Sequence, residues 1–439
     1  MRRTLRALAC CLSLSAASLV ACAASTPSSS SPTRRAPELT ILDDDYARAL
    51  AEARATKRPI VAVTSAAWCD ACREMRATVL TDPLLVPTAR DVVWLAIDVE
   101  RDKNAAFVAR FASEGQPVVW VIDPTDESAA LAWRGTVAAP LLASLVRRTS
   151  DAIHRRDPGG DGAAALVRAF RADASGETKR AIDEYKLVVD RASGADRALA
   201  VVAWTAIHLA TGDLAACADV ALRENAKLPS DLRANVVALG LTCDPASLPL
   251  LEAAHALVAD ATVLASDRSS LFDRIVAADR RSSDDAALTR DARAWLAFVD
   301  AQSRTARSPA ARASLDGARL AAHLALREPD AAIPALARSE RDLPSDCAPP
   351  AHLARAFAAA RRWEDALRAI ERALALAYGP YRIVLFARKV DIELGNGDPH
   401  AALRTLDDAL VLARSLSLTG TYARDRAALE VRRAEWRAR

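Results

Sequence analysis

The stretch "RPIVAVTSAAWCDACREM", residues 58–75, carries a β-branched apolar run followed by two cysteines, Cys69 and Cys72, three positions apart. The run favours a buried strand, and the residues after Cys69 favour a helix. A thiolate at Cys69 would face the unpaired N–H groups at the start of that helix, which lowers a thiol pKa and makes the sulfur a nucleophile. Cys72, one turn further along, is placed to attack a mixed disulfide formed on Cys69. The pair is therefore a candidate redox centre.

The residues around this pair alternate between strand and helix patterns. Runs of branched and aromatic residues predict strands at 58–66, 91–100, 118–123 and 129–137. Apolar residues at helical spacing predict helices at 43–56, directly after the cysteines, at 102–113 and at 140–155. The acidic "DDD" at 43–45 is interpreted as a solvated helix start. This order predicts a small α/β sandwich with a mixed sheet over residues 41–154.

The segment "WCDACREMRATVLTDPLLV", residues 68–86, resembles the thioredoxin-like family, especially the branch that contains the C-terminal domain of membrane thiol:disulfide interchange reductases. Members of that branch share Trp-Cys-x-x-Cys-Lys, then a Ser/Asp-Pro step, then a Val-Asp-Val strand. They also place a cis-proline beside the disulfide in a Gly-x-Pro step, which "GQP" at 115–117 matches.

The resemblance implies a thioredoxin-like fold and exchange of protein thiols and disulfides, with no cofactor. It implies that Cys69 and Cys72 are catalytic and form the redox disulfide. It also implies that three residues shape the substrate groove: Trp68, Gln116 and Pro117.

One departure from the family concerns the proton acceptor. The family buries an acidic residue six positions before the first cysteine, and Val63 stands there in this chain. Glu74 or water would then have to assist the resolving thiol. Asp70, between the cysteines, should oppose a thiolate at Cys69 by like-charge repulsion.

Two alternatives for the cysteine pair stay open. A structural disulfide would keep the same residues without exchange activity. A zinc site would need two further ligands, and the six histidines are scattered without ligand spacing, so no metal is expected.

The N-terminus has the pattern of an export signal. Arg2, Arg3 and Arg6 precede a short apolar run that ends in "LVAC", residues 19–22. That tetrapeptide resembles the lipobox of bacterial lipoproteins, which implies a signal peptide at 1–21, lipidation of Cys22 and a membrane anchor. The alternative is a plain secretory signal cut after "ACA". The Ser/Pro-rich residues 22–40 predict a disordered tether.

Export would place the chain in the bacterial cell envelope, facing the periplasm. Ala23 follows the lipidated cysteine in place of the acidic residue that retains well-studied lipoproteins at the inner membrane, so the resemblance slightly favours the outer membrane. The periplasm is an oxidising compartment, where close cysteines can cycle as a disulfide.

Beyond the breaker cluster at 155–162, interpreted as a linker, residues 163–439 are rich in alanine and in helical spacing. In "PAHLARAFAAARRWEDALRAIERALALAYGP" the order of bulky and small residues resembles a tetratricopeptide repeat. Equivalent small positions, 34 or 36 residues apart where repeats are adjacent, occur at Ala181, Cys217, Ala332, Ala366 and Ala402. The phase is lost between residues 244 and 314. The sequence predicts an all-α helical solenoid that binds a protein or peptide partner.

The remaining cysteines give weaker signals. Cys217 occupies a small-residue repeat position and is interpreted as core packing. Cys243 and Cys347 could form a long-range disulfide or remain isolated thiols. Trp363 is interpreted as packing in a repeat turn. The net charge of +3, without a basic block carrying aromatics, argues against nucleic-acid binding.

Two hypotheses follow from these patterns. The first is an exported thiol:disulfide oxidoreductase whose helical repeats recruit clients. The second is a non-catalytic envelope scaffold, in which the thioredoxin-like domain is structural and the repeats mediate protein–protein interaction.

Overall fold

The computed structural model describes residues 39–439 except 113–114, 156–161, 417, 419 and 438–439. The predicted signal peptide at 1–21, Cys22 with its predicted lipid, and almost all of the predicted tether lie outside the described residues. Glu38–Arg439 form one compact unit. Within the described residues, no helix combines the length and apolarity needed to cross a membrane.

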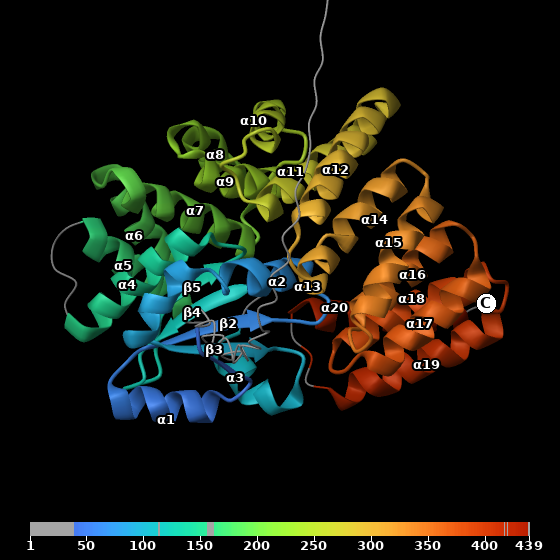
Figure 1. The fold of residues 1–439 in the computed structure, drawn as a ribbon, viewed down its shortest axis with the longest axis horizontal. Helices are drawn as coiled ribbons and strands as arrows, with labels where there is room; N and C mark the ends of the chain where they lie inside the picture. The colour runs from blue at the N-terminus through green and yellow to red at the C-terminus, as the bar shows by residue number, and fades with distance from the viewer. Residues whose placement is uncertain (1–38, 113–114, 156–161, 417, 419, 438–439) are drawn as a thin grey trace, which may run out of the picture. The chain divides into compact units, whose positions relative to one another are not determined.

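A five-stranded mixed sheet forms the first part of this unit (Figure 1). The strands are β1 (Ile41–Asp43), β2 (Ile60–Ser65), β3 (Val93–Asp98), β4 (Val118–Ile122) and β5 (Ala129–Arg134), in the order β1-β3-β2-β4-β5. The first three strands run parallel, whereas β4 pairs antiparallel with β2 and β5. The α/β class predicted from the sequence is confirmed. The sequence prediction missed β1, because three residues are too few to show an alternating pattern.

Helices and turns surround the sheet. They are α1 (Tyr46–Thr56), α2 (Asp70–Glu74), the π-helical turn η1 (Met75–Val79), the 3₁₀ segments η2 (Pro83–Arg90) and η3 (Asp102–Asn104), α3 (Ala105–Arg110) and α4 (Ala139–Arg155). The "DDD" interpretation holds for Asp45, which caps α1. Asp44 departs from it, since its carboxylate accepts hydrogen bonds from the Asp98 N–H at 2.7 Å and from the Asn104 amide at 2.8 Å.

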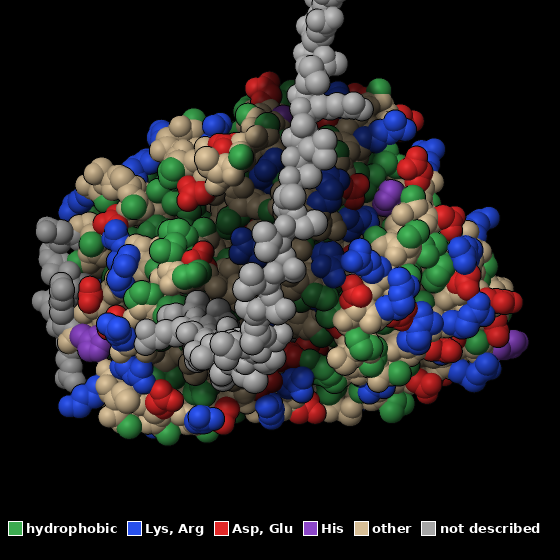
Figure 2. All heavy atoms as spheres, in the orientation of Figure 1, with side chains coloured by type: hydrophobic (Ala, Val, Ile, Leu, Met, Phe, Trp, Pro, Cys, Tyr) green, Lys and Arg blue, Asp and Glu red, His purple; other side chains and the backbone are tan. Residues whose placement is uncertain are grey.

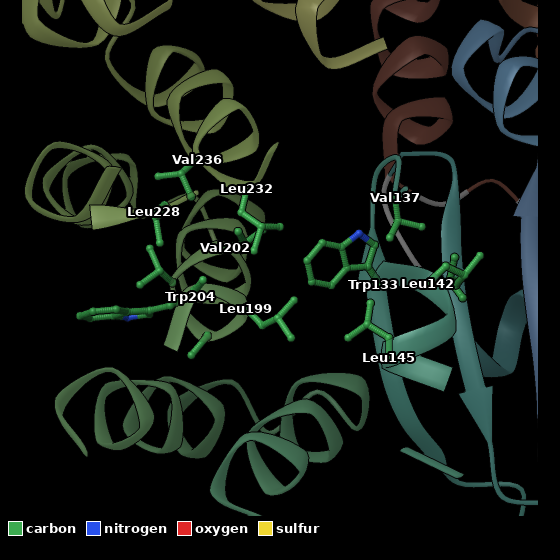
Figure 3. Close-up of a cluster of buried hydrophobic side chains, with 14 of the residues drawn as sticks. Trp133, Val137, Leu142, Leu145, Leu199, Val202, Trp204, Leu228, Leu232 and Val236 are labelled. Carbon is green, nitrogen blue, oxygen red and sulfur yellow. The ribbon is translucent and has the colours of Figure 1, made fainter. Parts of the chain in front are cut away.

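The sheet buries both faces with alternate side chains of each strand. One face, including Ile60, Leu95 and Trp120, packs against α1 and α3. The opposite face, including Val61 and Trp133, belongs to a core that continues through α4 into the helices beyond it. Figure 3 shows Trp133 and Leu145 of the sheet region on one side of this core, facing Leu199 from the helical region. The sheet is therefore covered on both faces.

The rest of the chain is helical, as predicted from its alanine-rich helical periodicity. The helices are α5 (Gly162–Ala174), α6 (Thr178–Arg191), α7 (Gly194–Ala210), α8 (Leu214–Glu224), η4 (Asn225–Lys227), α9 (Ser230–Cys243), α10 (Leu248–Val258), α11 (Ala265–Ser282), α12 (Asp285–Thr305), α13 (Pro309–Ala313), α14 (Asp316–Ala325), α15 (Pro329–Asp342), α16 (Ala348–Ala359), α17 (Trp363–Leu376), α18 (Tyr381–Gly395), α19 (Pro399–Ser415) and α20 (Gly420–Arg437).

Successive helices pack as pairs, including α5 with α6, α7 with α8, α16 with α17, and α18 with α19. The small residues predicted at the tightest helix contacts are all fully buried: Ala181, Cys217, Ala332, Ala366 and Ala402. A side chain larger than alanine would separate the two backbones at these positions. The helical solenoid class is therefore confirmed, and four helices, α10 to α13, occupy the interval 244–314 where the sequence repeat loses phase.

Ion pairs between neighbouring repeats explain the mixed charge of the solenoid surface. Arg372 of α17 lies 2.7 Å from Glu340 of α15, and Arg433 of α20 lies 2.6 Å from Asp407 of α19. Figure 2 shows basic and acidic side chains interspersed over the helices at the right of the view. Exposed pairs of this kind each stabilise the fold by about 1 kcal/mol or less.

Candidate functional site

Strand β2 and helix α2 position the two cysteines of the candidate site. The strand ends at Ser65, and four residues later Cys69 is the N-cap of α2. The Cys72 N–H donates to Cys69 Sγ at 3.0 Å, so the first sulfur accepts a bond from one of the free amides of the helix start. Cys69 and Cys72 form a disulfide with their Cα atoms 5.2 Å apart.

The Gly-x-Pro segment lies at the neighbouring strand end. The Gln116–Pro117 peptide bond is cis, as the resemblance implies. Val118 pairs with Thr64 in the β2–β4 ladder, so Pro117 lies one register step beyond, beside the end of β2 that leads to the cysteines. Gln116 Oε1 accepts a hydrogen bond from the Thr64 hydroxyl at 2.5 Å. The fold therefore brings 115–117 and the cysteine segment to one edge of the sheet.

The position six residues before Cys69, where the family buries an acidic side chain, lies within β2 and is occupied by Val63. Val63 is buried in the sheet between Ala96 and Val119. Glu74, considered from the sequence as a substitute, lies against α11, where the Ser266 N–H donates to its carboxylate. Burial, with Asp267 nearby, raises the pKa of Glu74 to about 7. Its described contacts join α2 to the helical region and do not include the cysteine pair.

Asp70 does not face the cysteines as an isolated charge. Arg73 lies 2.6 Å from its carboxylate, and the Gly317 N–H donates to it. Burial raises the pKa of Asp70 to about 6 although the Arg73 guanidinium opposes the shift. The repulsion expected between Asp70 and a Cys69 thiolate is weakened, because Arg73 offsets the charge.

Arg73 also reaches across to the helical region. Its guanidinium lies 2.8 Å from Asp346, just before α16. His352 Nε2 lies 3.7 Å from Asp70 Oδ2, but burial and the nearby Arg355 and Arg73 lower the pKa of His352 to about 3, so its ring is neutral at pH 7. Residues that follow the first cysteine thus bind directly to α14 and the start of α16.

Trp68, predicted to shape the groove, is partly buried beside the pair. Its indole N–H donates to Glu100 Oε1 at 3.0 Å, and its ring lies 6.4 Å from that of Tyr381. Glu100 also accepts from the Tyr381 backbone N–H at 2.8 Å and from the Tyr422 hydroxyl at 2.5 Å. Burial raises the pKa of Glu100. Sequence reasoning missed Glu100, and the only available signal was an acid at the end of the strand pattern 91–100.

The other cysteines differ from their sequence interpretation. Cys217 is fully buried, as expected for core packing, but it also forms a disulfide with Cys243 that joins α8 to the end of α9. The option of a Cys243–Cys347 disulfide is therefore wrong. Cys347 is a free, buried thiol in a cluster with Trp68 and Leu353. Burial raises the pKa of Cys347 to about 12, which keeps this thiol protonated.

Among the described residues, no group of three or more His, Cys, Asp or Glu side chains is placed to hold a metal ion. Trp363 packs against Gly395 of the neighbouring helix pair. The catalytic and substrate-binding roles of Cys69, Cys72, Trp68, Gln116 and Pro117 remain predictions.

The fold and the cysteine segment define a thioredoxin-like region followed by a tetratricopeptide-like helical solenoid. Residues 40–124 match the family model described as thioredoxin-like. No curated protein sequence matches the chain. Among solved structures, the chain is similar to the "TPR2AB-domain:pHSP90-complex of yeast Sti1", at 12% identity over 62% of this chain and 98% of that one, with a TM-score of 0.23. The solenoid class rests on the helix pairs and buried small residues described above.

Proposed function

We propose that this chain is an exported, lipid-anchored thiol:disulfide oxidoreductase. The observation that carries the proposal is the Cys69–Cys72 disulfide at the start of α2, where the Cys72 N–H donates to Cys69 Sγ. A donor aimed at this sulfur favours its thiolate over its thiol in the reduced pair.

The proposed exchange has two balanced steps. The Cys69 thiolate attacks one sulfur of a substrate disulfide, forming a mixed disulfide and releasing the other substrate sulfur as a thiolate that takes a proton. Cys72 then loses its proton and attacks Cys69 Sγ, which forms the Cys69–Cys72 bond and releases the second substrate thiol. Two electrons pass from the pair to the substrate, and the reverse sequence oxidises a substrate dithiol. Trp68, Gln116 and Pro117 border the approach to Cys69.

An insulin-reduction assay on the purified chain tests the proposal. We expect Cys69→Ser to abolish turnover and Cys72→Ser to accumulate a mixed disulfide between Cys69 and the substrate. Cys347→Ala should keep full turnover, since that thiol lies outside the exchange. Turnover that survives in Cys69→Ser would contradict the proposal.

The scaffold function is the second candidate, and two observations favour it. Cys69 and Cys72 are each only 5% exposed, and Val63 replaces the family's buried acid. A pair that stays oxidised across a wide range of glutathione redox ratios, in a chain that shows no insulin turnover, would support the scaffold over the oxidoreductase.

Export and anchoring are proposed from residues 1–22 alone. Labelled palmitate should be incorporated into the wild-type chain expressed in a Gram-negative host but not into Cys22→Ser. A chain that is exported yet never acylated would instead support the plain secretory signal.

The proposed partner of the repeats is a protein or an extended peptide, because helical solenoids offer long contact surfaces built from successive helix pairs. Pull-down of a client by the Cys72→Ser variant would identify it. Loss of capture after reduction would show that the mixed disulfide holds the client.

A further inference from the structure

The redox disulfide is covered within its own chain. A substrate sulfur must reach Cys69 Sγ along the S–S axis for exchange to occur. Cys69 and Cys72 are each 5% exposed, and they cluster with Ala66, Trp68 and Val99. Trp68, on one face of this cluster, is partly buried and packs against the core of the C-terminal helices.

Glu100 is the centre of this contact. It follows β3, and its side chain binds three donors: the indole N–H of Trp68, the backbone N–H of Tyr381 and the hydroxyl of Tyr422. The residue is 2% exposed, so its bonds are shielded from competing water. One carboxylate therefore joins the tryptophan beside the cysteines to α18 and α20.

The segment between α17 and α18 lies directly on the end of β3. The Tyr378 hydroxyl donates to Asp98, and Arg101 stacks on the Tyr378 ring with 4.7 Å between its Cζ and the ring centroid. A Cβ on Gly379 would lie 2.1 Å from the Glu100 carbonyl oxygen, so the two backbones touch. Only glycine permits this approach.

A second contact with the helical region is made by the residues that follow Cys69. Figure 1 shows α2 beside α13, and the two helices pack together. Arg73 binds Asp346 at 2.8 Å, and a Cβ on Gly317 would lie 2.3 Å from Asp70 Oδ2. The residue on each side of Cys69, Trp68 and Asp70, is thus held by a different part of the helical region.

We propose that the helices from α14 to α20 form an intramolecular cap over the redox pair, and that a protein substrate reaches Cys69 only when this cap opens at the Glu100 contact. The inference rests on the proposed function for its biological meaning. The cap itself is tested by the chemical accessibility of the disulfide, which needs no substrate turnover.

The test compares the wild-type full chain with the double variant Tyr378→Phe/Tyr422→Phe. Both substitutions keep the aromatic ring and remove a hydroxyl that binds a carboxylate of the thioredoxin-like region. Neither residue belongs to the proposed exchange machinery. Reduction of Cys69–Cys72 by tris(carboxyethyl)phosphine is followed by alkylation and mass spectrometry, which separates this disulfide from Cys217–Cys243.

We expect the double variant to be reduced about tenfold faster, because loss of the hydrogen bonds to the buried Glu100 and the half-buried Asp98 shifts the closed–open equilibrium by about that factor. The matched control is Tyr46→Phe/Tyr185→Phe, which removes two hydroxyls that bind Glu127 and Asp173 away from the redox pair. The control should be reduced at the wild-type rate.

Equal reduction rates in the wild type, the double variant and the control would overturn the cap. Acceleration in the control as large as in the double variant would overturn it as well, since general loosening would then explain the effect. The proposed function fails by a different result: faster chemical reduction of the double variant while insulin turnover stays absent. The chemical reduction rate therefore tests the cap, and insulin turnover tests the proposed oxidoreductase, so failure of one proposal can be told from failure of the other.

Discussion

Four carboxyl groups at the contact between α2 and the helical region hold their protons to unusually high pH. Burial is the largest cause for each of them. The pKa rises to about 6 for Asp70 and Asp267, and to about 7 for Glu74 and Asp316. An acid whose folded pKa exceeds its unfolded value binds more protons in the folded state. The contribution of these groups to stability is therefore complete at acidic pH and falls as the pH rises toward 7.

Glu74→Gln tests this linkage at one residue. The stability that protonated Glu74 contributes should be lost between about pH 4.5, the ordinary pKa of a glutamate, and about pH 7, the pKa of Glu74 in the folded chain. The variant cannot ionise, so we expect its free energy of unfolding at pH 8 to exceed that of the wild type by about 1–2 kcal/mol. Urea unfolding at pH 5 and pH 8 measures the difference. Glu364→Gln, whose side chain is 82% exposed, is the control and should leave the profile unchanged. Identical profiles for Glu74→Gln and wild type would refute the linkage.

Gly379→Ala tests the backbone contact with Glu100. Gly379 and Gly397 both have positive φ, so alanine at either position costs about 1–2 kcal/mol. Gly397 has nothing within 4 Å of its missing Cβ, whereas the Gly379 Cβ would meet the Glu100 carbonyl. We expect Gly379→Ala to lose about 1–3 kcal/mol more than Gly397→Ala in the free energy of unfolding. Equal losses would show that the two backbones do not touch in solution.

The cysteine pair could be found from the sequence because its signal is local: a strand, two thiols three residues apart and a helix. Its surroundings could not. Glu100 binds the Tyr381 amide 281 positions away, and Arg73 binds Asp346 across 273 positions. Neither residue type nor local spacing carries information about such partners, so the sequence could show where exchange chemistry lies but not what covers it.

At the scale of elements, the Cys217–Cys243 disulfide links neighbouring helices. A cross-link over 26 positions restricts the unfolded chain and stabilises the fold by about 3 kcal/mol. We expect Cys243→Ala to lose about that much free energy of unfolding and to leave exchange at Cys69 unchanged. Cys347→Ala, which removes a buried thiol without a cross-link, should lose less. A loss in Cys347→Ala as large as that in Cys243→Ala would show that packing, not the cross-link, sets the effect.

Ala366 occupies a small-residue position of the best-matched repeat, where two helices are expected to pack closely. This residue is fully buried in α17, whereas Ala359 at the end of α16 is exposed. Ala366→Leu should force the two helices apart and cost about 1–3 kcal/mol of the free energy of unfolding. Ala359→Leu should change it by less than about 0.5 kcal/mol. Thermal melts of the two variants measure the contrast, and similar melting temperatures would contradict the assigned repeat phase.

The helix pairs could be predicted because small residues recur where two helix backbones approach, and the residues that form this pattern lie within the sequence of a single repeat. The disulfide was not, since Cys217 fits the small position equally well as a free thiol. Whether its sulfur finds a partner depends on how α9 turns back onto α8. That turn lies between Glu224 and Ser230, and it brings Cys243 at the end of α9 back to Cys217.

At the scale of the molecule, the sequence predicted two regions separated by residues 155–162, but hydrophobic periodicity does not tell which apolar faces meet. One core cluster runs from Trp133 and Leu142 near the sheet to Leu199 and Val236 in the helices (Figure 3). Arg134 at the end of β5 also donates to the Asp173 carboxylate of α5 through Nη1 and Nη2, at 2.9 and 3.0 Å. The last helix pair, α18 with α19, instead packs around a separate cluster that includes Leu406.

This division of the core predicts which parts of the full chain lose stability together. Leu199 is 1% exposed in the shared core, and Leu406 is fully buried in the separate cluster. Each Leu→Ala substitution should cost about 2–5 kcal/mol locally. In native-state hydrogen exchange, we expect Leu199→Ala to lower the protection of amides in β5 and α4 as much as in α7 and α9, because one core stabilises all four elements. Leu406→Ala should lower protection in α18 and α19 and leave β5 at its wild-type value. Wild-type protection of β5 in Leu199→Ala would mean that the sheet is stable without the helices packed beside it, and that the thioredoxin-like region is an independent domain joined to the solenoid only at its surface.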